Sequence, residues 1–165
     1  MEDCLRMKPG ALRRLTRAEA ELAAEMFGLG LSTARVRIFA IPWWKRAFAP
    51  CGRLIAWPAS SALADFGGPG VPVEIQGVFV HELTHVWQAQ NGVNLLAAKL
   101  RAGDGACDYA YDLLDGRGFS ERNIEQQAMM VEHAFLASRG RAAPYPASLY
   151  AAALPDRGAA GTIGV

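Results

Sequence analysis

Residues 73–90 read VEIQGVFVHELTHVWQAQ, and they carry the strongest structural signal in the chain. It predicts an amphipathic helix, because it follows Pro72, carries an acid in its first turn and meets Asn91-Gly92, a pair suited to a left-handed helix end. At roughly 100° per residue, apolar side chains gather on one side and polar ones on the other. The apolar side holds Phe79, Val80, Leu83, Val86 and Trp87, and the other side holds His81, His85, Gly77 and Gln88. We therefore expect the apolar face to pack in the core and to fix the position of the polar face, called here the polar front.

The polar front carries His81-Glu82-Leu83-Thr84-His85, the pattern H-E-x-x-H. Residues i and i+4 are neighbours on a helix surface, so His81 and His85 can bind one Zn²⁺. Glu82 lies about 100° round the helix, which is too far to join the chelate but suits a catalytic base acting on a water. The pattern predicts metal-assisted hydrolysis of a peptide bond. The alternative is a polar helix face that binds nothing.

A catalytic zinc needs a third protein ligand. The extended pattern with Gly at position 88 and His at position 91 is excluded, because Gln88 and Asn91 stand there. Glu125 is the predicted ligand, since it lies early in a second helix expected over residues 121–138. Glu132 shares the face of that helix and is its nearest rival. The remaining alternatives are His133, Asp104, Asp108, Asp112 and Asp115.

Three further side chains are candidates for the chemistry. Tyr109 and Tyr111 are phenols suited to donating to an oxyanion, with core or interface packing as the alternative. His133 projects about 80° from Glu125 on the same helix and is a candidate to hydrogen-bond a ligand or substrate. The alternative for His133 is plain exposure to solvent.

Shorter elements surround the two helices. Thr16-Arg17-Ala18-Glu19 is a capping-box pattern, and it predicts a helix over residues 17–27. Residues 35–41 and 53–57 read as short strands, which we expect to pair antiparallel. The predicted fold class is α+β and mostly helical, with a small antiparallel sheet packed on the H-E-x-x-H helix. Further helices are expected over residues 95–101 and 108–114, and Ser120 is expected to cap the helix that follows.

Two adjacent tryptophans follow the first strand, in Pro42-Trp43-Trp44-Lys45. Such a pair is either an exposed docking patch or one packed and one half-packed residue. The sequence leaves both interpretations open.

Length and composition limit the remaining classes. With 165 residues, 52% of them hydrophobic, we expect a single domain over residues 1–140 and an Ala/Pro/Gly-rich tail over residues 141–165. A net charge of +1 argues against a nucleic-acid partner. The longest run without a charge, Leu83 to Ala98, is too short and polar for membrane insertion. The first residues have no signal-peptide pattern, so we expect synthesis in the cytoplasm.

The order of these motifs resembles a known family, the zincin-like domains of Vgr-related proteins associated with bacterial contractile injection systems. The resemblance covers about residues 15–136. It rests on Arg35-Val36-Arg37-Ile38, Ala47-Phe48, Gly52, Ile55, Asp65-Phe66, HELTHVWQ at 81–88 and NIEQQA at 123–128. It implies a minimal gluzincin-type zinc metallopeptidase with one Zn²⁺ per chain on His81, His85 and Glu125, and with Glu82 as general base.

The resemblance also implies a place in the cell. It suggests a component of a type VI or related contractile secretion system, acting on a protein or peptide substrate, with export that needs no signal peptide. The alternative function is a catalytically silent adaptor or scaffold that keeps the zincin fold within a secretion assembly.

Overall fold

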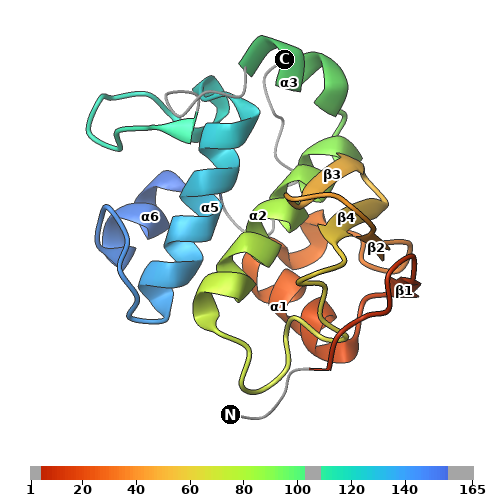
Figure 1. Cartoon of the computed structure of the whole chain (residues 1–165). Helices are drawn as coiled ribbons and strands as arrows, with labels where there is room; N and C mark the ends of the chain where they lie inside the picture. Colours follow the sequence, from red (N-terminus) through yellow and green to blue (C-terminus); the bar gives the residue numbers. More distant parts are fainter. Residues whose placement is uncertain (1–4, 103–108, 156–165) are drawn as a thin grey trace.

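Helix α2 (Val73–Gln90) runs through the centre of the molecule, with the sheet on one side and helix α5 (Ile124–Ser138) on the other (Figure 1). The computed structural model describes residues 5–102 and 109–155. The other elements are β1 (Leu12–Arg14), α1 (Arg17–Phe27), η1 (Gly28–Gly30), β2 (Arg37–Ile41), β3 (Phe48–Cys51), β4 (Leu54–Pro58), α3 (Leu95–Ala102), η2 (Phe119–Glu121) and α6 (Ala147–Ala153). The α+β class is confirmed.

The bounds predicted for the central helix are confirmed, but both of its faces are buried. Every residue from Phe79 to Gln88 is buried. The apolar face joins the hydrophobic core with α1 and the sheet, while the polar face packs on α5. Gly77 permits this approach, because a Cβ there would lie 3.1 Å from Leu136 Cδ2. The polar front therefore faces a neighbouring helix.

The sheet is mixed, and the antiparallel pairing expected between its two predicted strands is wrong. Its order is β1-β2-β4-β3, with β2 parallel to β4 and the two outer pairs antiparallel. The reason is β3, which the sequence analysis did not identify. The chain leaves β2, runs back along the far edge as β3 and turns tightly at Gly52 into β4, which fills the slot between them. The chain reverses direction before β3 and again before β4, so β4 runs parallel to β2.

The capping box predicted before α1 is confirmed and also anchors the sheet. The Thr16 hydroxyl oxygen accepts the backbone N–H of Glu19, and the Glu19 carboxylate in turn accepts the backbone N–H of Thr16. The buried Glu19 carboxylate also forms a two-pronged ion pair with Arg13 of β1, at 2.6 and 2.7 Å, and accepts the backbone N–H of Phe66. One side chain thus joins β1, α1 and the loop before α2.

The second half of the chain departs from two expectations, the cap of α5 and the helix over residues 108–114. The cap of α5 is Asn123, paired with Gln126 in a capping box, whereas Ser120 lies in η2. Residues 110–114 form no helix, because Asp112 and its neighbours form a hydrogen-bonded turn; residue 108 lies outside the described range. Within the region expected to be a tail, α6 packs on α5 and buries Tyr150.

No helix in the described parts of the chain combines the length and hydropathy that a membrane span requires.

Candidate metal centre

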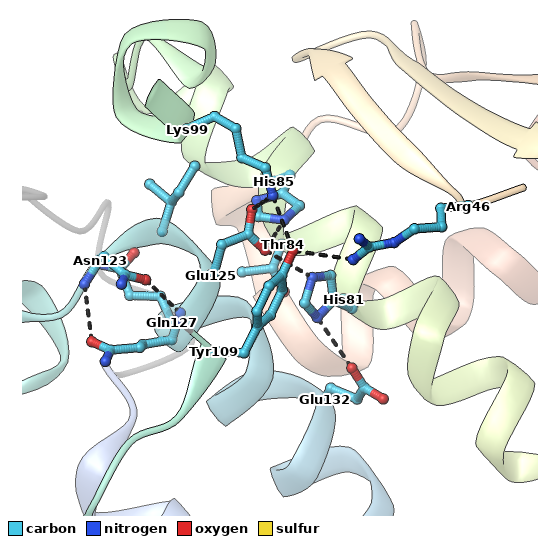
Figure 2. Close-up of polar contacts among 12 residues, drawn as sticks. Arg46, His81, Thr84, His85, Lys99, Tyr109, Asn123, Glu125, Gln127 and Glu132 are labelled. Atoms are coloured by element: carbon cyan, nitrogen blue, oxygen red, sulfur yellow. Dashed lines mark hydrogen bonds and ion pairs between the residues drawn. The ribbon is translucent and has the colours of Figure 1, made fainter. Parts of the chain in front are cut away.

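Two histidines of α2 meet a glutamate of α5. The rings of His81 and His85 lie edge to face with centroids 5.0 Å apart. Glu125 Oε2 lies 3.5 Å from His81 Nε2 and 3.3 Å from His85 Nε2. One donor atom from each residue lies within 4.8 Å of the other two, and all three side chains are buried. Figure 2 shows them converging. Two imidazole nitrogens and a carboxylate oxygen form a donor set that suits zinc.

Each imidazole is oriented by a hydrogen bond at its other nitrogen. His81 Nδ1–H donates to Glu132 Oε2 at 3.1 Å. His85 Nδ1–H donates to Gln88 Oε1 at 2.8 Å. Because both acceptors are oxygens, each ring carries this proton on Nδ1 and turns Nε2 toward the shared point. Glu132, the nearest rival for the third ligand, therefore orients a histidine, and Glu125 is the carboxylate that faces both rings.

The buried side-chain amide of Gln127 fixes the orientation of Gln88 by a hydrogen bond. Gln88 Nε2 donates to Gln127 Oε1 at 2.9 Å and to the backbone oxygen of Ile124 at 3.0 Å. Gln127 Nε2 donates in turn to the backbone oxygens of Arg122 at 3.0 Å and Phe119 at 3.2 Å. These two amides connect His85 of the candidate metal centre to the segment that leads into α5.

Lys99 of α3 reaches the glutamate from its other side. Its Nζ lies 2.6 Å from Glu125 Oε1, which leaves Oε2 facing the histidines. Lys99 was not predicted from the sequence, because no spacing rule relates residues on α3 and α5. Gln88 was not predicted to orient His85 either, although its i+3 spacing from His85 on one helix was an available signal.

Glu82 faces the same cleft as the histidines. Its side chain is buried, and its Oε2 accepts no hydrogen bond from any described residue. Burial raises the pKa of Glu82, with the charge of His85 and then His81 opposing that shift. A buried carboxylate oxygen without a partner is costly, and a raised carboxyl pKa in a cleft is typical of a proton-transfer group.

The charges of the cluster favour a cation. Burial lowers the pKa of His81, but the Glu125 and Glu132 carboxylates outweigh burial and raise it to about 9. Burial raises the pKa of Glu125, yet hydrogen bonds from the two histidines and Lys99 hold it well below its usual range. The site thus stabilises added positive charge between ordered oxygen and nitrogen donors. The residues present therefore fit a divalent metal ion.

A cleft of about 930 Å³ lies over this cluster. Its walls come from the loop before β3, from β3 itself, and from α2, α3 and α5. Apolar side chains dominate away from the cluster, among them Trp44, Phe48, Leu95, Leu96 and Met129. An apolar cleft of this size with a few convergent polar groups is typical of a ligand site.

Tyr109 lines this cleft, as a candidate for the chemistry should. Its ring stacks on His81 with centroids 6.5 Å apart. Its hydroxyl accepts hydrogen bonds from Lys99 Nζ at 3.0 Å and from Arg46 Nη2 at 3.2 Å. Figure 2 shows Arg46 and Lys99 approaching it from different elements. Two cations on one phenol oxygen favour its action as a donor.

Tyr111 and His133 lie together in another cluster. Tyr111 Oη is 2.6 Å from His133 Nδ1 and 2.8 Å from Tyr150 Oη of α6. Burial lowers the pKa of His133 and raises that of Tyr111. The structure does not bring this pair to His81 and His85, and its contacts instead fasten α6 to α5.

The aspartates considered as third ligands are also accounted for. Asp115 forms an ion pair with the buried Arg122 at 2.8 Å. Asp112 accepts a hydrogen bond from Tyr145 Oη at 2.8 Å. Asp104 and Asp108 lie outside the described residues. Within the described ranges, the carboxylate at both histidines belongs to Glu125.

The fold and the site together define an α+β domain of the H-E-x-x-H class, with a buried His/His/Glu cluster suited to a metal ion. No protein-family model matches the chain. The solved effector domain of Pseudomonas aeruginosa VgrG2b superposes with a TM-score of 0.68 at 31% identity, covering 89% of this chain and 84% of that one. The chain therefore belongs to the family of the VgrG2b effector domain.

The sequence comparison agrees with the structural one. The chain is 35% identical over 136 residues to the type VI secretion system spike protein VgrG2b of Pseudomonas aeruginosa, a match that covers 75% of this chain. It covers 13% of the spike protein, so the relationship concerns one part of a much longer protein. The resemblance to Vgr-related domains is thus confirmed at the level of the family.

Proposed function

We propose that this chain is a zinc-dependent peptidase domain that hydrolyses peptide bonds in a protein substrate. The observation that carries the proposal is the unpartnered, buried Oε2 of Glu82, in the same cleft as the His/His/Glu cluster. A silent scaffold gains nothing from such a group, whereas hydrolysis needs a base that can take up a proton.

In this proposal each side chain has a distinct role. His81, His85 and Glu125 would hold the metal, which when bound would polarise a carbonyl and make a water more acidic. Glu82 accepts a proton from the attacking water and passes it to the leaving amine. Tyr109 donates from its hydroxyl to the oxygen that gains charge.

The sheet edge supports a peptide as the substrate. β3 is the last strand in the sheet order, and Phe48, Ala49 and Pro50 of this strand line the cleft beside the histidines. An edge strand can bind an extended chain through its backbone groups. A peptide lying along β3 would occupy the same cleft as Glu82.

The relatives support a place in type VI secretion. The matched region is a part of a spike protein and a solved effector domain. We therefore propose that this domain acts with a contractile secretion system and reaches its substrate by that route.

The test compares wild type with Glu82→Gln and Glu125→Ala. After purification without chelator, wild type and Glu82→Gln should each carry one zinc per chain, and Glu125→Ala should have lost most of it. Wild type should cut a denatured, unfolded protein, and Glu82→Gln should be slower by at least about 100-fold. Rates are read by mass spectrometry of the products.

Equal cleavage by wild type and Glu82→Gln would mean a contaminating protease. Zinc binding by both without cleavage by either would overturn the peptidase and leave the silent scaffold. Zinc retained in full by Glu125→Ala would overturn the ligand set.

A further inference from the structure

Trp43 stands in a backbone conformation that suits another residue. It follows Pro42 in the turn after β2, and its φ is +58°. Proline followed by a positive φ is typical of a type II turn, in which glycine or asparagine is preferred at this position. A bulky aromatic residue with positive φ is a strained outlier.

The strain of Trp43 is not offset by packing. Its side chain is 98% exposed, so the indole buries almost nothing in the fold. Strained residues persist where function requires them. The indole thus costs stability without packing on this chain, which indicates a contact outside it.

Trp43 belongs to an aromatic rim, which we define as Trp43, Trp44 and Phe48. Trp44 is 51% exposed, and its ring pairs with that of Phe48 at a centroid distance of 5.6 Å. Tryptophan and phenylalanine are the residues that anchor binding partners at interfaces. Trp44 and Phe48 therefore form a preformed apolar pair, and the exposed Trp43 adjoins them in the sequence.

The rim continues into the cleft. Trp44 and Phe48 line the same cleft as His81 and Glu82, and Phe48 is the first residue of the edge strand β3. A chain bound along β3 would therefore run directly onto the rim. This continuity favours the substrate itself as the occupant.

We propose that the aromatic rim is a substrate-binding surface that selects extended polypeptide segments carrying a bulky apolar side chain beside the scissile bond. This inference rests on the proposed function for the identity of the partner as a polypeptide. Lys45 and Arg46 lie between the rim residues, and residues 42–51 contain no acid, so neutral or acidic segments fit better than basic ones.

The test measures binding without requiring cleavage. The full chain carrying Glu82→Gln is titrated into fluorescein-labelled short peptides of Ala, Ser and Gly, with either Phe or Ala at the centre, and anisotropy gives the affinity. The Phe peptide should bind more tightly. Trp43→Asn and Trp44→Ala should each weaken its binding by about tenfold.

Two comparisons separate binding from folding. Trp43→Asn should unfold at the same temperature as the parent or a higher one, because asparagine tolerates the turn better. Leu29→Ala is the matched control, since Leu29 is also 98% exposed but lies in η1, outside the aromatic rim. It should leave peptide binding unchanged.

Several outcomes would overturn the inference. One is equal binding of the Phe and Ala peptides, and another is unchanged peptide affinity in both rim variants. If the rim variants keep their peptide affinity but no longer bind phosphatidylglycerol vesicles, the partner of the rim is a lipid surface. Rim-dependent peptide binding without any cleavage by wild type would overturn the peptidase alone.

Discussion

The two histidines of the candidate metal centre are oriented by acceptors of different charge. His81 donates to the carboxylate of Glu132, whereas His85 donates to the neutral amide of Gln88. A carboxylate in place of Gln88 would face the side-chain oxygen of Gln127, which now accepts the amide N–H. An amide is required there because one group must accept on one side and donate on the other.

We expect Gln88→Leu to weaken zinc binding by about 10- to 100-fold, because His85 loses the partner that fixes its tautomer and orientation. Affinity is measured by competition with a chromogenic chelator. Gln90→Leu is the control, since Gln90 lies on the same helix but bonds the backbone of Ser32 and Gly52. Equal zinc affinity in Gln88→Leu and wild type would contradict the role given to this amide.

At the scale of elements, one buried charge links α1 to β1 and to the loop before α2. Glu19 satisfies its carboxylate with Arg13 and with the backbone of Thr16 and Phe66. Removing the Glu19 carboxylate would leave the guanidinium of Arg13 without its ion-pair partner.

Glu19→Ala should therefore lower the free energy of unfolding by about 3 kcal/mol, as expected when one member of a buried pair is removed. Urea unfolding followed by circular dichroism gives the value. Glu21→Ala is the matched control: its i,i+4 pair with Arg17 is exposed, and its loss should change stability by less than about 0.5 kcal/mol. A similar small effect for Glu19→Ala would show that the network adds little.

Asp115, in the turn before η2, should make the stability of the fold depend on pH in acid. The backbone N–H of Arg117, followed by the Arg117 and Arg122 side chains, lowers the pKa of Asp115 to about 2. Because the pKa of Asp115 is lower in the folded state than its ordinary value near 4, the ionised carboxylate stabilises the fold at pH values above about 4. This stabilisation is lost as the pH falls toward 2. Asp115→Asn should accordingly flatten the fall in melting temperature between about pH 4 and pH 2. Parallel melting curves for wild type and the variant would argue against this.

At the scale of the whole molecule, the candidate metal centre joins two halves of the chain. His81 and His85 come from α2, next to the sheet, and Glu125 comes from α5, next to α6. Figure 1 shows these helices side by side. A ligand that binds both helices only when they are packed together must stabilise that packing.

Removing the metal should thus lower the melting temperature. At a free zinc concentration of 100 times the Kd, the stabilisation is about 2.7 kcal/mol, and chelation should abolish it. Thermal unfolding with zinc and with excess chelator tests this. His85→Ala should melt at the same temperature in both conditions. A wild type that is equally indifferent to zinc would contradict a metal centre bridging the helices.

Local patterns were sufficient where the information is local. The capping box of α1 and the bounds of α2 follow from neighbouring residues, because capping and helical periodicity act within a few positions. The same holds for the site: His81, Glu82 and His85 share one helix, and their spacing fixes their relative positions. The cap of α5 was misplaced because Ser120 and Asn123 are both good caps, and the Gln126 side chain decided between them.

Short-range spacing in the sequence was enough to predict the α+β class, the central helix and the histidine pair. Features that depend on contacts between distant segments came only from the folded structure. Glu125 rather than Glu132 faces both histidines, and Lys99 and Gln127 also lie at the site. In the sheet, β2 pairs in parallel with β4 because β3 forms the edge beyond β4. Each depends on how separate elements pack, and packing is fixed by the shape and burial of the whole chain rather than by any one segment.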